Sequence, residues 1–198
     1  MPNCIQTTLG QDWGKLHRNI QQRFNKTPQL DQPIYYKGNM DKVVCSKAGW
    51  LFAHFCRLIG KPLTPYQGDK VPVTVKLFKN KNSRGVFWQR IYHFNKRNAY
   101  QVVSEKKVEH GRMMECVGAG FGMFLDVYAH KQALHFKSTR YFLKIFGIYF
   151  SLPHCITPGQ THVIHQNLGT HKFRFTISIQ HKQLGQTFYQ TGVFHEST

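Results

Sequence analysis

Hydrophobic and polar residues alternate with a period of two along most of the chain from Val71 onward. This spacing indicates β-strands with one buried face, because successive side chains of a strand point to opposite sides of a sheet. The clearest example spans residues 85–94, where one face carries Val86, Trp88, Arg90, Tyr92 and Phe94. We expect further strands at 34–41, 71–77, 99–105, 113–117, 121–128, 133–137, 141–150, 161–166, 172–180 and 186–195.

The first third of the chain has a helical pattern instead. Asp12 is a candidate N-cap for a helix over 12–24, in which apolar residues recur at Trp13, Leu16, Ile20 and Phe24. Ser46 is a candidate N-cap for a second helix, which Gly60 and Pro62 would end. We expect one side of this second helix to carry Trp50, Phe52, Ala53, Phe55 and Leu58.

Together these elements predict a mainly β protein. About eight to ten short, evenly spaced strands are typical of an antiparallel barrel or sandwich, and closure is expected because long open edges aggregate. We therefore predict a single domain over 1–198, with a helical N-terminal part at 1–65 and a closed, lipocalin-like β-barrel at 66–198. The two helices should cover one end or side of the barrel.

The charge of the chain is strongly unbalanced. Lys and Arg number 27 against 9 Asp and Glu, which gives a formal net charge of +18. Such a chain attracts nucleic acid, anionic lipid or acidic partners. No pattern typical of a nucleic-acid-binding fold is present, and the aromatic residues alternate into the core. An anionic membrane surface is a comparable alternative, with the helix around Trp50 as its apolar side.

The cysteines and the apolar runs indicate in which cellular compartment the protein is expected and whether it should span a membrane. An odd number of widely spaced cysteines, Cys4, Cys45, Cys56, Cys116 and Cys155, argues against a disulfide framework. Reduced thiols fit the cytoplasm best. The apolar runs fall short of the ~20 residues that a membrane-spanning helix needs, and the N-terminus lacks the features of a signal peptide. We expect a soluble or at most peripheral protein.

Arg90 and Glu115 form the candidate polar centre of the barrel. A guanidinium on an apolar face stays protonated, so it requires a carboxylate, carbonyl groups or an anionic ligand. Glu115 lies in the apolar run 113–117 and could be that carboxylate. The pair could simply stabilise the barrel. Alternatively, Arg90 could hold the anionic head of a ligand in a pocket that has Trp88 and Tyr92 in its wall, with Phe175 and Tyr189 as further wall residues.

Other kinds of site have less support. His162 and His165 form an HxxH pattern, but residues three apart on a strand face opposite ways, so we expect no metal site and no cofactor. No nucleophile motif is present, and cysteines in apolar stretches are unreactive. Residues 118–122 are rich in glycine without preceding a helix, which favours a bulge or strand bend over a dinucleotide site. Glu115 could act as a general acid or base if Arg90 does not reach it.

Several short motifs resemble one bacterial family, the domain of unknown function 4166. These motifs are Leu9-Gly10 with Trp13 and Leu16, Tyr36-Lys37-Gly38, Val71-Pro72-Val73-Thr74-Val75, Trp88-Gln89-Arg90 with Phe94, Glu115-Cys116-Val117-Gly118, Gly147 ahead of Leu152-Pro153, Phe173-Arg174-Phe175, and Leu184-Gly185 with Tyr189 and Gly192. The resemblance spans nearly the whole chain. It implies a cytoplasmic domain, found alone or fused to nucleotide-dependent oxidoreductase-like domains, which would make such a protein a possible partner. It implies no activity.

The preferred interpretation is therefore non-catalytic binding of a small apolar or amphiphilic ligand inside the barrel, through Trp88, Arg90, Tyr92 and Glu115. An enzyme that uses Glu115 on such a ligand is the second class. Binding of nucleic acid or of an anionic membrane surface is the third.

Overall fold

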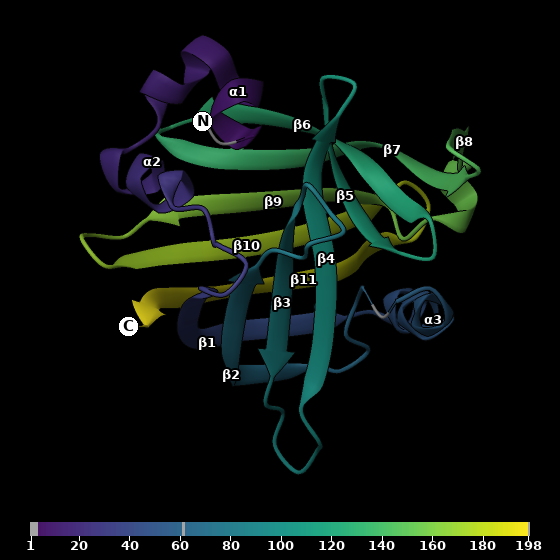
Figure 1. The fold of residues 1–198 in the computed structure, drawn as a ribbon. Coiled ribbons are helices and arrows are strands. Elements are labelled where there is room, and N and C mark those ends of the chain that lie inside the picture. Colours follow the sequence, from purple (N-terminus) through teal and green to yellow (C-terminus); the bar gives the residue numbers. More distant parts are fainter. Residues whose placement is uncertain (1–3, 61, 198) are drawn as a thin grey trace.

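Eleven β-strands dominate the computed structural model, which describes residues 4–60 and 62–197 (Figure 1). The strands are β1 (Ile34–Cys45), β2 (Gly68–Phe78), β3 (Val86–Tyr92), β4 (Tyr100–Glu109), β5 (Arg112–Gly118), β6 (Phe121–His130), β7 (Ala133–Ile145), β8 (Ile148–Ser151), β9 (Gln160–Asn167), β10 (Lys172–His181) and β11 (Gly185–Ser197).

Ten of these strands form a closed antiparallel barrel, which confirms the predicted fold class. The order runs β6-β5-β4-β3-β2-β1-β11-β10-β9-β7, and pairing of β6 with β7 closes the ring. β8 lies outside the ring and pairs with β7. Because every barrel strand has a neighbour on both sides, the ring leaves no long open edge for aggregation.

The predicted division at residue 65 does not separate helices from barrel. β1 lies in the helical part expected at 1–65, yet it pairs with β2 on one side and β11 on the other. The strand predicted at 133–137 also continues to Ile145, because a bulge at Thr139 carries the chain through a polar segment. The expected strand at 141–150 is divided by a turn at Phe146 and Gly147.

The N-terminal helix predicted at 12–24 is divided into shorter pieces. They are the 3₁₀ turn η1 (Gly10–Lys15) and α2 (Arg18–Asn25), and a further helix, α1 (Cys4–Leu9), precedes the predicted range. Asp12 does not cap α2, because it lies inside η1. The cap is His17, whose Nδ1 accepts a hydrogen bond from the Asn19 amide at 3.1 Å. These pieces insert Ile5, Leu9, Leu16, Ile20 and Phe24 into one end of the barrel core.

α3 (Lys47–Phe55) and the 3₁₀ turn η2 (Cys56–Leu58) form the second predicted helical segment, on another side of the barrel (Figure 1). Ser46 caps α3 as expected, since its Oγ accepts a hydrogen bond from the Gly49 amide at 3.1 Å. However, α3 buries Gly49 and Ala53, and the large apolar residues expected to form its packed side are mostly exposed. A third 3₁₀ turn, η3 (His154–Ile156), lies between β8 and β9. No helix in the described residues is long and apolar enough to cross a membrane.

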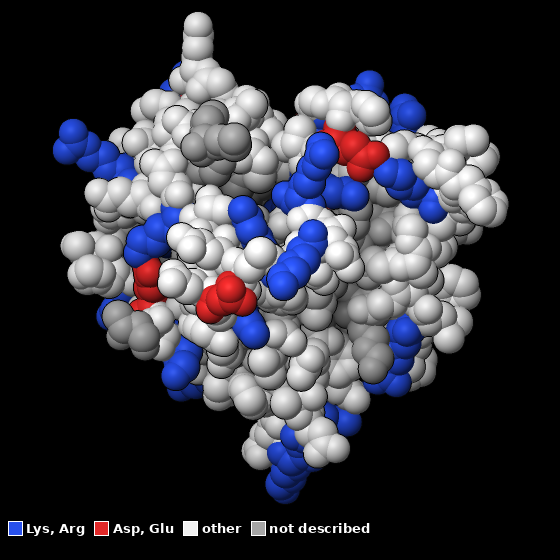
Figure 2. Space-filling model, in the orientation of Figure 1, with Lys and Arg blue, Asp and Glu red and all other residues white. Residues whose placement is uncertain are grey.

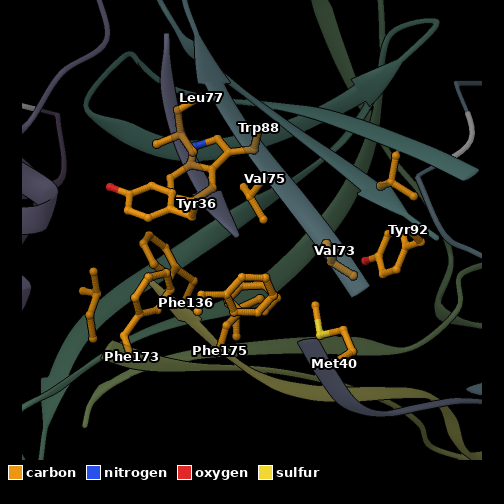
Figure 3. Packing of buried hydrophobic residues seen from close by; sticks show 14 of the residues in the cluster. Tyr36, Met40, Val73, Val75, Leu77, Trp88, Tyr92, Phe136, Phe173 and Phe175 are labelled. Carbon is orange, nitrogen blue, oxygen red and sulfur yellow. The ribbon is translucent and has the colours of Figure 1, made fainter. Parts of the chain in front are cut away.

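Aromatic side chains fill much of the barrel interior. Figure 3 shows Tyr36 and Trp88, from β1 and β3, facing Phe136, Phe173 and Phe175 from β7 and β10. On β3, Trp88, Arg90 and Tyr92 are buried while the residues between them are only partly buried. The predicted inward face of this strand is therefore confirmed.

Candidate functional site

A buried cluster of charged residues lies on the inner wall formed by β3, β4 and β5. Strand register makes Lys106 of β4 the direct partner of Glu115 of β5. Lys106 Nζ lies 2.7 Å from Glu115 Oε2, and Ser104 Oγ donates a hydrogen bond of 2.6 Å to Glu115 Oε1. Two residues apart on β4, Ser104 and Lys106 share the inward face. The sequence predicted Arg90 as the partner of Glu115, but Lys106 is the closer one.

The cations keep Glu115 ionised. Burial by itself would raise the pKa of Glu115, but the charges of Lys106 and then Arg90, with hydrogen bonds from Lys106 and Ser104, outweigh it and lower the pKa. Burial lowers the pKa of Lys106, although the nearby Glu115 carboxylate opposes that shift. The Lys106 ammonium also lies 5.3 Å from the centre of the Trp88 ring, so the ring adds to the stabilisation of its charge by the Glu115 carboxylate.

Arg90 is the loosely held member of the cluster. It is buried, and its Nη2 lies 4.0 Å from Glu115 Oε1, the outer limit of an ion pair. Its guanidinium carbon lies 5.7 Å from the centre of the Phe175 ring. Among residues 4–60 and 62–197, no group accepts a hydrogen bond from this guanidinium. With Arg90 and Lys106 against Glu115, the cluster holds one positive charge more than it holds negative charges.

Arg90 and Glu115 lie at the inner end of a cavity of about 290 Å³. The opposite end reaches the surface, because Phe55 and Ile156, which also line the cavity, are 68% and 61% exposed. Most of the wall between the two ends is apolar, and it includes Phe52, Ile59, Leu63, Phe121, Met123, Leu152, Val163, Ile177 and Ile179. A largely apolar cavity with a few convergent polar groups is typical of a small-ligand site.

The other predicted wall residues lie elsewhere. Trp88 lines a second, smaller cavity of about 50 Å³ near α2. Tyr92 is on the same strand as Arg90, and the Phe175 ring lies near the Arg90 guanidinium; both are buried in the core and neither lines the larger cavity. Tyr189 does not line this cavity either: it lies on the outer face of β11, opposite Ser178, since its neighbours Phe188 and Gln190 are the inward residues.

Sequence reasoning missed three polar residues of the interior. Ser104 and Lys106 lie on the same face of β4 as the apolar residues Tyr100 and Val102, so the period of two could have predicted their burial. Their polarity favoured an exposed position instead. Gln190 is also buried; its Oε1 accepts a hydrogen bond of 2.9 Å from the Tyr92 hydroxyl, a contact across the barrel that no local pattern indicates, while its Nε2 has no partner among the described residues.

The structure shows where the HxxH histidines and the glycine-rich segment 118–122 lie. His162 and His165 point to opposite sides of β9, as predicted: His162 lies near Tyr128 and His135, and His165 is buried. The described residues contain no cluster of three or more His, Cys, Asp or Glu that could hold a metal ion. The glycine-rich segment forms a bulge and the β5–β6 turn, with positive φ at Gly118, Ala119 and Gly120, which agrees with the predicted strand bend.

The fold and this cavity define the chain as a closed antiparallel β-barrel protein with a charged group at the inner end of an apolar cavity. The chain belongs to the family described as domain of unknown function (DUF4166), whose sequence model matches residues 16–194. No curated protein and no solved structure matches the chain.

Proposed function

We propose that the protein binds, without altering it, an amphiphile that has a single anionic head group. Arg90 carries the proposal, because it lines the cavity and its guanidinium donates no hydrogen bond to any of the described residues, with Glu115 only at 4.0 Å. A carboxylate or phosphate accepts paired, charge-assisted hydrogen bonds from a guanidinium. One bound negative charge would also neutralise the excess positive charge of the Arg90, Lys106 and Glu115 cluster.

The shape of the cavity supports an elongated ligand. Its inner end is charged and its wall toward Phe55 and Ile156 is apolar, so the head group would lie inside the barrel and the tail would run outward. Its volume is close to the lower end of the range of roughly 300–1,000 Å³ that is usual for small-ligand sites. A single-chain amphiphile fits this size better than a lipid with two chains.

An enzymatic role for Glu115 has less support. The lowered pKa keeps this carboxyl ionised, so it has no proton to give, and it is a weak base whose two oxygens already accept hydrogen bonds from Ser104 and Lys106. Cys56 also lines the cavity, but burial raises its pKa to about 11, which leaves an unreactive thiol. Nucleic acid likewise has less support, because Trp88, Tyr92 and Phe94 are in the core and unavailable for base stacking.

The proposal also covers the cellular compartment of the protein and a protein partner. We place the protein in the cytoplasm, in keeping with its five free cysteines. A nucleotide-dependent oxidoreductase-like protein that produces or consumes the ligand remains a prediction, which rests on the family resemblance.

The test compares Arg90→Met with the native protein in binding a fluorescent long-chain fatty acid. Arg90→Met should fold, because Lys106 and Glu115 remain as a balanced pair. We expect its affinity to fall about 10- to 100-fold, which corresponds to the loss of hydrogen bonds to a charged group. Arg84→Met, an exposed arginine just before β3, is the matched control and should bind normally.

A neutral fatty alcohol of the same length provides a second comparison. The native protein should prefer the acid by a similar factor, and Arg90→Met should lose that preference. Equal binding of the acid by the native protein and Arg90→Met, or no binding by either, would refute the proposal. Native mass spectrometry of freshly purified protein, followed by extraction, would then identify any ligand that is carried.

A further inference from the structure

Large apolar residues are exposed around the open end of the cavity. We define the apolar rim as Leu51, Phe55, Leu58, Phe146, Ile148 and Ile156, all of which are exposed. Phe55 and Ile156 also line the cavity, so part of the rim borders its opening. Leu51 and Phe55 belong to α3, Leu58 to η2, Ile148 to β8 and Ile156 to η3. Figure 1 shows α3 and β8 at the same side of the barrel, with α3 below β8 in this view. Exposed apolar residues that gather in this way mark an interaction surface.

The turn between β7 and β8 places Phe146 in a backbone conformation that a phenylalanine does not favour. Phe146 and Gly147 both have positive φ, 47° and 83°, as in the two-residue turns that prefer Asn-Gly. A phenylalanine is strained in this conformation, and its side chain is 99% exposed. Neither packing nor turn geometry accounts for this aromatic residue, which therefore indicates a role outside the protein itself.

The charges near the rim indicate what it contacts. The chain has no Asp or Glu over residues 42–68 or 127–195, the two stretches that contain the rim. Glu109 reaches this region from β4, but its charge is balanced by ion pairs with Lys144 and Lys107. The exposed cations Lys47, Arg57 and Lys182 lie in these stretches, and hydrogen bonding between His181 and His154 holds the turn with Lys182 beside η3. Figure 2 shows that basic residues far outnumber acidic ones on the visible face as well. An apolar surface with surrounding cations complements an anionic bilayer.

We propose that the apolar rim docks onto anionic membranes, with Phe146 and Leu58 inserted among the lipid head groups. Docking does not require the Arg90 site. It would place the opening of the cavity against the bilayer, so that a single-chain amphiphile could pass between membrane and barrel without crossing water; this consequence rests on the proposed function.

The test is sedimentation with vesicles of phosphatidylcholine, with and without about one third phosphatidylglycerol. The native protein should bind the anionic vesicles, and added salt should weaken binding, since the attraction to the surface charge is screened. The double variant Phe146→Asn, Leu58→Gln removes two inserting side chains, and its apparent affinity should fall about tenfold or more. It should fold normally, because Asn suits the turn and Leu58 is 81% exposed.

Leu168→Asn is the matched control. Leu168 is also an exposed leucine, but it lies in the β9–β10 connection and is not one of the rim residues, so its replacement should leave vesicle binding unchanged. Arg90→Met should bind vesicles like the native protein, which separates failure of docking from failure of the ligand site.

Three results would overturn the docking proposal. The native protein could fail to bind anionic vesicles, or the double variant could bind them as well as Leu168→Asn does. The rim could also join two copies of the chain: size-exclusion chromatography would then show a dimer that the double variant abolishes, without any vesicle binding.

Discussion

At the scale of single residues, the stability of the barrel interior depends on how the charge of Glu115 is paired. A buried carboxylate is costly unless it is paired, and Glu115 has Lys106 at 2.7 Å, Ser104 at 2.6 Å and Arg90 at 4.0 Å. Each of the two cations in turn depends on this carboxylate. The three charges therefore form one unit, in which loss of Glu115 matters more than loss of Arg90.

We expect Glu115→Gln to lower the free energy of unfolding by about 3–5 kcal/mol, because it leaves two buried cations without a counter-charge. Urea denaturation at pH 7 measures this effect. Arg90→Met should cost clearly less, since it leaves a neutral pair, and Glu105→Gln, outside the cluster, is the control. Equal losses for Glu115→Gln and Arg90→Met would contradict the arrangement described for the cluster.

At the scale of elements, α3 is held by its smallest residues. Ser46 caps the helix and its amide donates to the Thr187 carbonyl at 3.0 Å, which fixes the start of α3 against β11. Gly49 lies against the same carbonyl: a Cβ placed there would come within 1.9 Å of the Thr187 oxygen. Close approach at Gly49 and Ala53 turns the bulky residues of α3 outward and leaves them available to the rim.

Gly49→Ala should therefore destabilise the protein by about 1–3 kcal/mol, although alanine is the better helix former, because the helix must move away from β11. Ser46→Ala should cost about 1 kcal/mol through loss of the cap. Gly14→Ala is the control glycine, since a Cβ there meets nothing within 4 Å. Thermal and urea unfolding measure all three, and a stabilised Gly49→Ala variant would refute this packing.

At the scale of the whole molecule, one end of the barrel is filled and the other is open. α1, η1 and α2 insert apolar residues at the filled end, where Phe24 packs against Trp88 and His165. His165 is surrounded by aromatic rings, and burial, followed by the charges of Arg23, Lys106 and Arg90, lowers its pKa well below the usual value. Folding therefore keeps this histidine neutral.

Global stability should vary with pH because burial lowers the pKa of His135, of His162 and of the most deeply buried of the three, His165. Below about pH 6.5 the unfolded chain binds a proton at His165 and the folded protein does not, so stability should fall as the pH drops. Between pH 6.5 and pH 5 this amounts to about 2 kcal/mol. Glu115, also with a lowered pKa, adds a further loss only below about pH 4.5.

Urea denaturation at pH 5 and pH 7 tests this expectation. His165→Leu should shrink the difference between the two pH values by about 2 kcal/mol, whatever its own stability. His110→Gln, at an exposed histidine, should leave the difference unchanged. An unchanged difference in His165→Leu would show that the histidine is not held neutral by the core.

Alternation along the chain was enough to predict several features. It identified most strands, the inward face of β3 and the burial of Arg90 and Glu115, because a period of two depends only on local backbone geometry. The excess of short strands then indicated a closed barrel. Where one face was clearly apolar, as at Trp88, Arg90 and Tyr92, the choice of the inner face was also correct.

Only the tertiary structure decided which side chains meet. Alternation does not give the register between strands, and it was register that placed Lys106 rather than Arg90 against Glu115. On β11, Tyr189 was expected in the wall of the pocket, whereas it is Gln190 that faces inward and accepts a hydrogen bond from the Tyr92 hydroxyl across the barrel. The large apolar residues of α3 are exposed because the helix contacts β11 through Gly49. In each case the deciding partner is distant in sequence, so local periodicity could not reveal it.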